Sequence, residues 1–180
     1  MVLSSEDSER FYNLFLPLLD YVNKQKGITT RLRNIRLKKN LDPNEVAKVA
    51  EVLWADPSVI DDYLKNTRDE ISERDRELIR SWKRRVSGRF IVERILKKGA
   101  ILLSDDKVYQ VSGIISSWDE LLPFGRCPAI IEATLIPFEN VIIPDGLLRF
   151  FDVAFGPGSR ELLRDEYMSA KESGEIIRQL

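Results

Sequence analysis

Apolar residues recur at intervals of three and four near the start of the chain, which is the pattern of a helix with one buried face. The apolar stripe consists of Phe11, Leu14, Phe15, Leu18, Leu19 and Val22. Ser4 or Ser5 is positioned to cap this helix, and Gly27 to end it. Pro17 lies inside the stripe and has no backbone N–H, so the sequence predicts a kink or a break near Leu16.

Helical spacing continues through the first 86 residues, in shorter segments that start at capping residues. Asp42-Pro43-Asn44-Glu45 places Asp at the N-cap, Pro at the first helical position and Glu two positions later. Asp56-Pro57-Ser58 repeats the Asp-Pro pair, and Ser72 starts a third helix. A short basic helix is expected over residues 28–35. We therefore predict an all-helical N-terminal part.

From Ser87-Gly88 onward, β-branched residues become frequent, and Gly and Pro separate short apolar segments. Strands are expected at Ala100–Leu103, Lys107–Ile114, Ala129–Ile136, Val141–Ile143 and Leu147–Ala154. The segment Phe90–Leu96 fits either a strand or a short helix. Ala129–Ile136 and Leu147–Ala154 are apolar on both faces, so the sheet should be covered on both sides or rolled into a barrel.

These patterns predict an α+β protein. A helical part, residues 1–86, packs on a small, strongly bent antiparallel sheet or barrel within residues 87–180, and a helix that follows Ser159 closes it. The two parts are expected to unfold as one cooperative unit, and residues 176–180 to return to an edge of the sheet. The expected core aromatic residues are Trp54, Trp82, Phe151 and Tyr167.

The composition narrows the chemistry. The chain has 180 residues and no histidine, so it lacks the usual general base at neutral pH and the commonest ligand of transition metals. We expect no catalytic residues, no metal site and no cofactor. Cys127 is the single cysteine, which fits a reducing cytoplasm. No apolar run approaches the ~20 residues that span a bilayer, so no membrane partner is expected.

Positive charge is concentrated in two runs, residues 24–39 and 83–98, although the formal net charge of the chain is -1. If the fold joins these runs, they would suit the phosphates of a nucleic acid. The candidate contact residues are Arg31, Arg33, Arg36, Arg84 and Arg85. The alternative is an ordinary solvated surface, paired with the acidic helices.

The turn Gly156-Pro157-Gly158-Ser159 lies between an apolar strand and a helix. Free backbone N–H groups at such a helix start attract anions, and Arg160 would add a positive charge. The candidate anion-binding residues are Gly156, Gly158, Ser159 and Arg160. The alternative is that the glycines supply unusual φ values and Ser159 caps the helix.

Three segments resemble bacterial cytoplasmic proteins, chiefly of Gram-positive bacteria, for which no activity is established. They are FYNLFLPLLDYVN, GRFIVERILKKGAILLSDDKVYQVSGI and LIPFENVIIPDGLL with FGPGSRELLRDEYMSAK. The resemblance covers both halves of the chain and implies a bacterial cytoplasmic protein. It implies no site residue.

The leading functional hypothesis is a non-catalytic intracellular binding or adaptor protein that recognises another protein. It rests on the missing histidine and on the lack of a catalytic set of residues. One alternative is a nucleic-acid-binding protein that uses the two basic runs. The other is an enzyme that acts on a phosphate-bearing substrate at residues 156–160.

Overall fold

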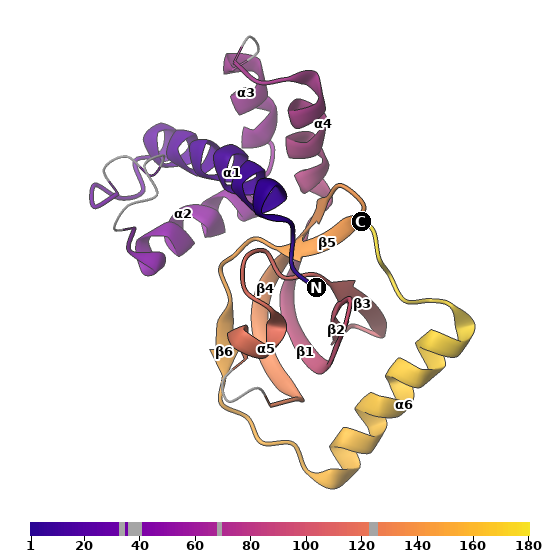
Figure 1. Ribbon diagram of the computed structural model, residues 1–180. Coiled ribbons are helices and arrows are strands. Elements are labelled where there is room, and N and C mark those ends of the chain that lie inside the picture. Colours follow the sequence, from indigo (N-terminus) through magenta and orange to yellow (C-terminus); the bar gives the residue numbers. More distant parts are fainter. Residues whose placement is uncertain (33–34, 36–40, 68–69, 123–125) are drawn as a thin grey trace. The chain divides into compact units, whose positions relative to one another are not determined.

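The computed structural model describes residues 1–32, 35, 41–67, 70–122 and 126–180. It divides into two compact units (Figure 1): a helical unit, Ser5–Lys83, and a barrel unit, Met1–Ser4 together with Arg84–Leu180. The predicted α+β class is confirmed, with helices at the N-terminal side, a small barrel and a C-terminal helix. The single cooperative unfolding transition stays a prediction.

The helical unit contains α1 Ser5–Lys26, α2 Pro43–Ala55, α3 Val59–Asn66 and α4 Glu73–Ser81. A 3₁₀ turn, η2 Trp82–Arg84, follows α4. Helix α1 continues through Pro17, so the predicted break does not occur. Proline in a helix interior costs about 3 kcal/mol. Here Leu14, Phe15, Leu18 and Leu19 are buried on both sides of it, and their packing offsets that cost.

The helix caps agree with the sequence at two of three places. The Asp42 carboxylate accepts the backbone N–H of Asn44 at the start of α2, and Ser72 caps α4. The prediction for α3 is wrong, because Ser58 and not Asp56 is the N-cap of this helix. Asp56 instead ends α2, and its carboxylate accepts the backbone N–H of Ser58 at 3.2 Å.

Four aromatic rings form the centre of the helical unit. Phe11 stacks on Phe15 with 5.2 Å between centroids, and Phe15 stacks on Trp54 at 6.0 Å. Trp82 meets Phe11 and Phe15 edge-on, at 6.0 and 5.8 Å. Both tryptophans are buried, which confirms them as core residues.

The cap of α4 should make the stability of the protein depend on pH. Burial opposes ionisation of Asp75, but hydrogen bonds from Ser72 and Arg10 outweigh it and hold the pKa of this carboxyl below its ordinary value of 3.8. A lowered folded-state pKa stabilises the protein above about pH 4, and the gain is lost as the pH falls through the folded value. Asp75→Asn weakens the hydrogen bonds from Ser72 and Arg10, and should cost about 1 kcal/mol at pH 7, the usual net contribution of a hydrogen bond.

Urea unfolding between pH 3 and pH 7 would measure this effect. The difference between the wild type and Asp75→Asn should shrink as the solution is acidified. Glu77→Gln removes an exposed acid from the same helix and serves as the control. A difference that stays constant with pH would contradict the proposed role of Asp75.

The barrel unit contains six strands and two helices among its described residues. They are β1 Val86–Leu96, β2 Gly99–Ser104, β3 Lys107–Val111, α5 Trp118–Leu121, β4 Ala129–Phe138, β5 Val141–Pro144, β6 Arg149–Phe151 and α6 Pro157–Ser173. The ambiguous segment Phe90–Leu96 is thus a strand. The segment predicted as a strand over Leu147–Ala154 is reduced to β6, and α5 was not predicted.

The strand order explains how the sheet closes. The order is β1-β2-β3-β5-β4, and β4 pairs again with β1, so five strands form a closed barrel. All pairings are antiparallel except β3 with β5, where Val111 lies opposite Ile142. The predicted antiparallel sheet is therefore wrong at this one pairing. This connectivity, with a short helix between β3 and β4, resembles that of the OB-fold, a five-stranded Greek-key barrel.

Inside the barrel, alternate residues of the strands pack with Trp118 of α5. The buried cluster includes Phe90, Val92, Ala100, Leu102, Tyr109, Val111, Trp118, Leu122, Ile131, Ala133, Leu135 and Ile142. The Trp118 indole N–H donates to the backbone oxygen of Val111 at 2.9 Å. This tryptophan therefore both fills the barrel and satisfies a buried polar group.

Both ends of the chain lie along β3 and the residues that follow it. Val2 forms a parallel bridge with Gly113, and Ile177 forms one with Tyr109. The backbone N–H of Gln110 donates to the oxygen of Ile177, and the N–H of Ile177 donates to the oxygen of Val108. The predicted return of the last residues to the sheet is confirmed.

Candidate functional site

A continuous apolar row crosses the outside of the barrel. The pairing register places Val108 opposite Leu103, Leu103 opposite Ile91, Ile91 opposite Ile130, and Ile130 opposite Phe151. Residues in such register point to the same face of a sheet. The row, which we call the apolar row, thus links β3, β2, β1, β4 and β6. An apolar row on an outer face needs a cover or a partner.

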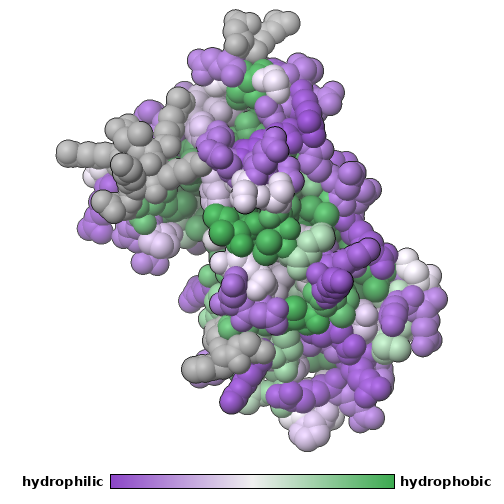
Figure 2. All heavy atoms as spheres, in the orientation of Figure 1, coloured by the Kyte–Doolittle hydropathy of each residue, from purple (hydrophilic) through white to green (hydrophobic). Residues whose placement is uncertain are grey.

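Helix α6 covers the part of the apolar row on β1, β2 and β3. Leu163, Tyr167 and Ala170 of α6 pack with Ile101 and Leu103 of β2 and with Val108 of β3. Figure 1 shows α6 along one side of the barrel, and Figure 2 shows hydrophilic side chains predominating over its outer surface. Tyr167 is buried, which confirms it as a core residue. It lies between α6 and the outer face of the barrel, and not in the barrel interior.

The other end of the row stays accessible. Ile130 and Phe151 are half-buried, and the next outward row holds Arg89, Glu132 and Arg149, all exposed. We call these five residues the arginine face. The guanidinium carbons of Arg89 and Arg149 lie 5.0 and 5.4 Å from the centroid of the Phe151 ring. Two cations at these distances are attracted to the ring and hold their apolar stems against it.

Glu132 moderates the charge of the arginine face. Its carboxylate lies 3.8 Å from the Arg149 guanidinium, and the two side chains are 50% and 76% exposed. An ion pair this open contributes little to stability. Its main effect is on the local potential: the face carries two positive charges and one negative charge around an apolar centre.

Sequence reasoning missed most of the arginine face. It placed Phe151 in the core, which is wrong, because Phe150 points to the barrel interior and Phe151 therefore points outward. Only Arg89 fell within a predicted basic run. The alternation in Arg149-Phe150-Phe151 was the available signal, since it puts Arg149 and Phe151 on one face of a strand.

The predicted nucleic-acid residues fall in different places. Arg31 belongs to the helical unit and is 78% exposed, 3.7 Å from the buried Glu45 carboxylate. Arg84 and Arg85 belong to the barrel unit and directly precede β1, with Arg84 exposed and Arg85 half-buried. Arg33 and Arg36 lie outside the described residues. The shared binding patch stays a prediction.

The predicted anion site at the start of α6 has a different geometry from the one expected. Gly156 is the N-cap with φ of −71°, and Gly158 and Ser159 already lie within α6. The predictions of unusual φ values at Gly156 and Gly158 and of a helix cap by Ser159 are therefore wrong. Arg160 donates to the backbone oxygens of Phe155, at 3.1 Å, and Cys127, at 3.3 Å. These bonds tie α6 to the chain before β4, and anion binding here stays a prediction.

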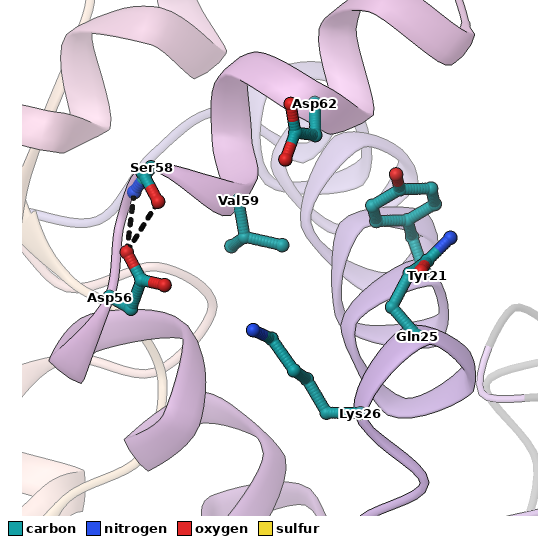
Figure 3. Close-up of a pocket in the computed structure, with 7 residues that line it drawn as sticks. All are labelled: Tyr21, Gln25, Lys26, Asp56, Ser58, Val59 and Asp62. Carbon is teal, nitrogen blue, oxygen red and sulfur yellow. Dashed lines mark hydrogen bonds between the residues drawn. The ribbon is translucent and has the colours of Figure 1, made fainter.

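A small pocket in the helical unit gathers polar groups between α1 and the turn that joins α2 to α3 (Figure 3). Its volume is about 130 Å³, and its lining includes Tyr21, Lys26, Asp56 and Asp62. Hydrogen bonds from Ser58 hold the pKa of Asp56 below its ordinary value. Sites for drug-sized ligands measure about 300–1,000 Å³ and are mostly apolar, so this pocket fits none of that size.

Cys127 should be an unreactive thiol. Burial, with added repulsion from Glu93 and Asp119, raises the pKa of Cys127 from 9.0 to about 11. Because the thiolate is the reactive form, alkylation by iodoacetamide at pH 7.5 should be about 100-fold slower than for N-acetylcysteine. The rate should increase about tenfold per pH unit while the protein stays folded. Rapid alkylation at pH 7.5 would show that the thiol is accessible and ionised.

Among the residues that the structure describes, no group of three or more cysteine, aspartate and glutamate side chains is arranged to hold a metal ion. Within the same residues, no helix is long and apolar enough to cross a membrane. Comparison of the chain with protein-family models, with curated proteins and with solved structures finds no match.

Proposed function

We propose that this chain is a non-catalytic binding protein and that it recognises another protein through the arginine face. The observation that carries the proposal is the half-buried, outward-facing Phe151 ring, with the guanidinium groups of Arg89 and Arg149 beside it. Arginine and aromatic residues are enriched at the energetic centres of protein interfaces, where apolar contact and charge recognition combine. A cytoplasmic location is part of the proposal, supported by the single cysteine and by the resemblance to bacterial cytoplasmic proteins.

The chemistry of the chain supports a binding role. No histidine is present in the sequence, and the thiol of Cys127 is held in its protonated form by burial. Arg160, the candidate charge of an anion-binding enzyme site, already donates to two backbone oxygens. An enzyme would have to rely on carboxylates, lysine or tyrosine for proton transfer.

A nucleic acid is the second candidate partner, because arginine and aromatic side chains also stack on bases. Three features of the barrel weigh against it. Glu132 lies in register between Arg89 and Arg149 and would repel phosphates. The face that binds oligonucleotides in OB-folds is covered here by α6. The apolar part of the arginine face also consists of one aromatic and one aliphatic residue, which suits a protein side chain better than a run of bases.

Affinity capture tests the proposal. The tagged wild type, Phe151→Asp and the control Lys97→Glu/Lys98→Glu are incubated with lysate of the cells that express the protein, with and without nuclease. Lys97 and Lys98 are exposed in the turn between β1 and β2, at the other end of β1 from Arg89. We expect a protein that the wild type and the control retain after nuclease treatment and that Phe151→Asp loses. Recovery of nucleic acid alone, or of the same proteins by all three, would contradict the proposal.

A further inference from the structure

We propose that the segment recognised at the arginine face is an acidic amphipathic helix of the partner. It places an apolar side chain on Phe151 and Ile130 and carboxylates beside Arg89 and Arg149. This inference rests on the proposed function and names the chemistry of the partner. Three features of the barrel support it: the outer surface already binds a helix of the same chain, the face has the width of one helix, and its net charge is positive.

Helix α6 shows what the outer surface of this barrel accepts. Its stripe Leu163, Tyr167 and Ala170, at positions i, i+4 and i+7, lies on the covered end of the apolar row. The Arg94 guanidinium stands 4.2 Å from the centroid of the Tyr167 ring. The covered end thus combines aliphatic barrel residues, an amphipathic helix and an arginine on an aromatic ring. Like the covered end, the accessible end has an aliphatic barrel residue, Ile130, and arginine beside an aromatic ring, but that ring, Phe151, belongs to the barrel itself.

The dimensions of the accessible end suit one helix. Neighbouring strands lie about 4.8 Å apart, and residues i and i+2 of a strand are about 7 Å apart. Ile130 and Phe151 are neighbours across β4 and β6, and Glu132 and Arg149 lie one such step along these strands. A helix with its side chains is about 10–12 Å wide, so a single helix covers both the apolar pair and the charged row.

An extended peptide is a weaker fit at the same place. Strand β6 is at the end of the sheet order, but it is only three residues long, Arg149–Phe151. Strand addition draws its affinity from a row of backbone hydrogen bonds, and so short a strand offers few of them. The Val153 N–H also bonds to the Phe151 oxygen, which turns the chain away from the sheet after β6.

The charge of the face selects an acidic partner. Arg89 and Arg149 are exposed, and Glu132 offsets only one of the two charges. Carboxylates on both flanks of the partner's apolar stripe would meet these guanidiniums with charge-assisted hydrogen bonds. Basic residues at the same positions would be repelled, so charge should decide between two helices of equal hydrophobicity.

The test uses two synthetic helices as probes. Each has about 18 residues, enough for appreciable helicity in water, with leucines at helical spacing and a terminal fluorophore. One carries glutamates on both flanks of the leucine stripe, and the other carries lysines at the same positions. Fluorescence anisotropy measures their affinity for the full chain. We expect the acidic peptide to bind at least ~10-fold more tightly than the basic one.

Three variants locate the contact. Phe151→Ala should lower the affinity for the acidic peptide by ~10-fold or more, as expected for a residue at the centre of an interface. Arg89→Glu/Arg149→Glu should reverse the preference and favour the basic peptide. Lys97→Glu/Lys98→Glu makes the same change in net charge elsewhere on the barrel and should alter the affinity by less than ~2-fold. Near-ultraviolet circular dichroism confirms that each variant is folded.

The proposal is overturned if the two peptides bind equally, or if the charge reversal leaves the preference unchanged. It is also overturned if an oligothymidine competes more strongly than the acidic peptide, or if Phe151→Ala dissociates a dimer of the wild type in sedimentation. Capture of a protein that depends on Phe151, combined with failure of the acidic helix to bind, would refute this inference alone. Capture of nucleic acid only would refute the proposed function itself.

Discussion

Replacing Gly99 by alanine should unfold the barrel unit or lower its free energy of unfolding by about 4 kcal/mol or more. A Cβ atom at Gly99 would lie 2.3 Å from the backbone oxygen and 2.9 Å from the carbonyl carbon of Val111. Gly99 also has φ of +123°, a conformation that other residues rarely adopt. Relief would require β3 to move away from β2, which breaks the hydrogen bonds that pair the two strands.

Gly158→Ala is the matched control for Gly99→Ala. Gly158 lies within α6, and an added Cβ there meets no atom of the described residues within 4 Å. Alanine has the higher helix propensity, so this change should be neutral or stabilising by up to ~1 kcal/mol. Thermal unfolding followed by circular dichroism would compare the two variants. A Gly99→Ala protein as stable as Gly158→Ala would show that the close contact of β2 and β3 is not required.

Trp118→Ala should cost about 3–5 kcal/mol, the range for removing a large buried aromatic side chain. Trp118 is 1% exposed and packs among the residues that fill the barrel. Its removal also leaves the Val111 oxygen without the indole hydrogen bond. Trp118→Phe keeps most of the volume and loses only that bond, so it should cost about 1–3 kcal/mol.

Chemical denaturation of the wild type and both Trp118 variants would separate the two contributions. Because Gly99 and Trp118 act on the same Val111 oxygen, their effects should not be additive in the double variant. Additive losses, or equal losses for Trp118→Ala and Trp118→Phe, would contradict this account of the barrel interior.

The helical unit could be read from the sequence because its signals are local. The stripe from Phe11 to Val22 and the capping residues Asp42 and Ser72 specify helices within one or two turns. The turn between β2 and β3 is local in the same sense, because it is formed by Asp105 and Asp106, which both have positive φ. Such positions depend on neighbours in the chain, so one sequence is sufficient to predict them.

The sequence left open a bent sheet or a barrel, and no local signal could decide that the barrel closes. Closure depends on β1 pairing with both β2 and β4, and no local pattern in Val86–Leu96 shows that this strand has two partners. Helix α5 is only four residues long, below the length at which helical periodicity can be recognised, so Trp118 was missed as a core residue.

The arginine face was missed for a related reason. Phe150 and Phe151 are adjacent and equally apolar, and the place of Arg149 two residues before Phe151 is the one local sign of which ring faces outward; the register of β6 against β4 decides it. A shift of one residue would exchange them. Arg89 and Arg149 are likewise distant in the sequence, and the pairing of β1, β4 and β6 brings both to the Phe151 ring. Sites of this kind become visible only when strand pairing is known.

The bridge between Val2 and Gly113 affects the order in which the two units can fold during synthesis. Met1–Ser4 belong to the barrel unit, yet the whole of Ser5–Lys83 is synthesised between these residues and their partner. The helical unit has its complete sequence early and can fold by local contacts while translation continues. Met1–Ser4 must wait, unpaired, until Gly113 emerges. An affinity tag fused before Met1 would therefore disturb the last-assembled unit and not the first.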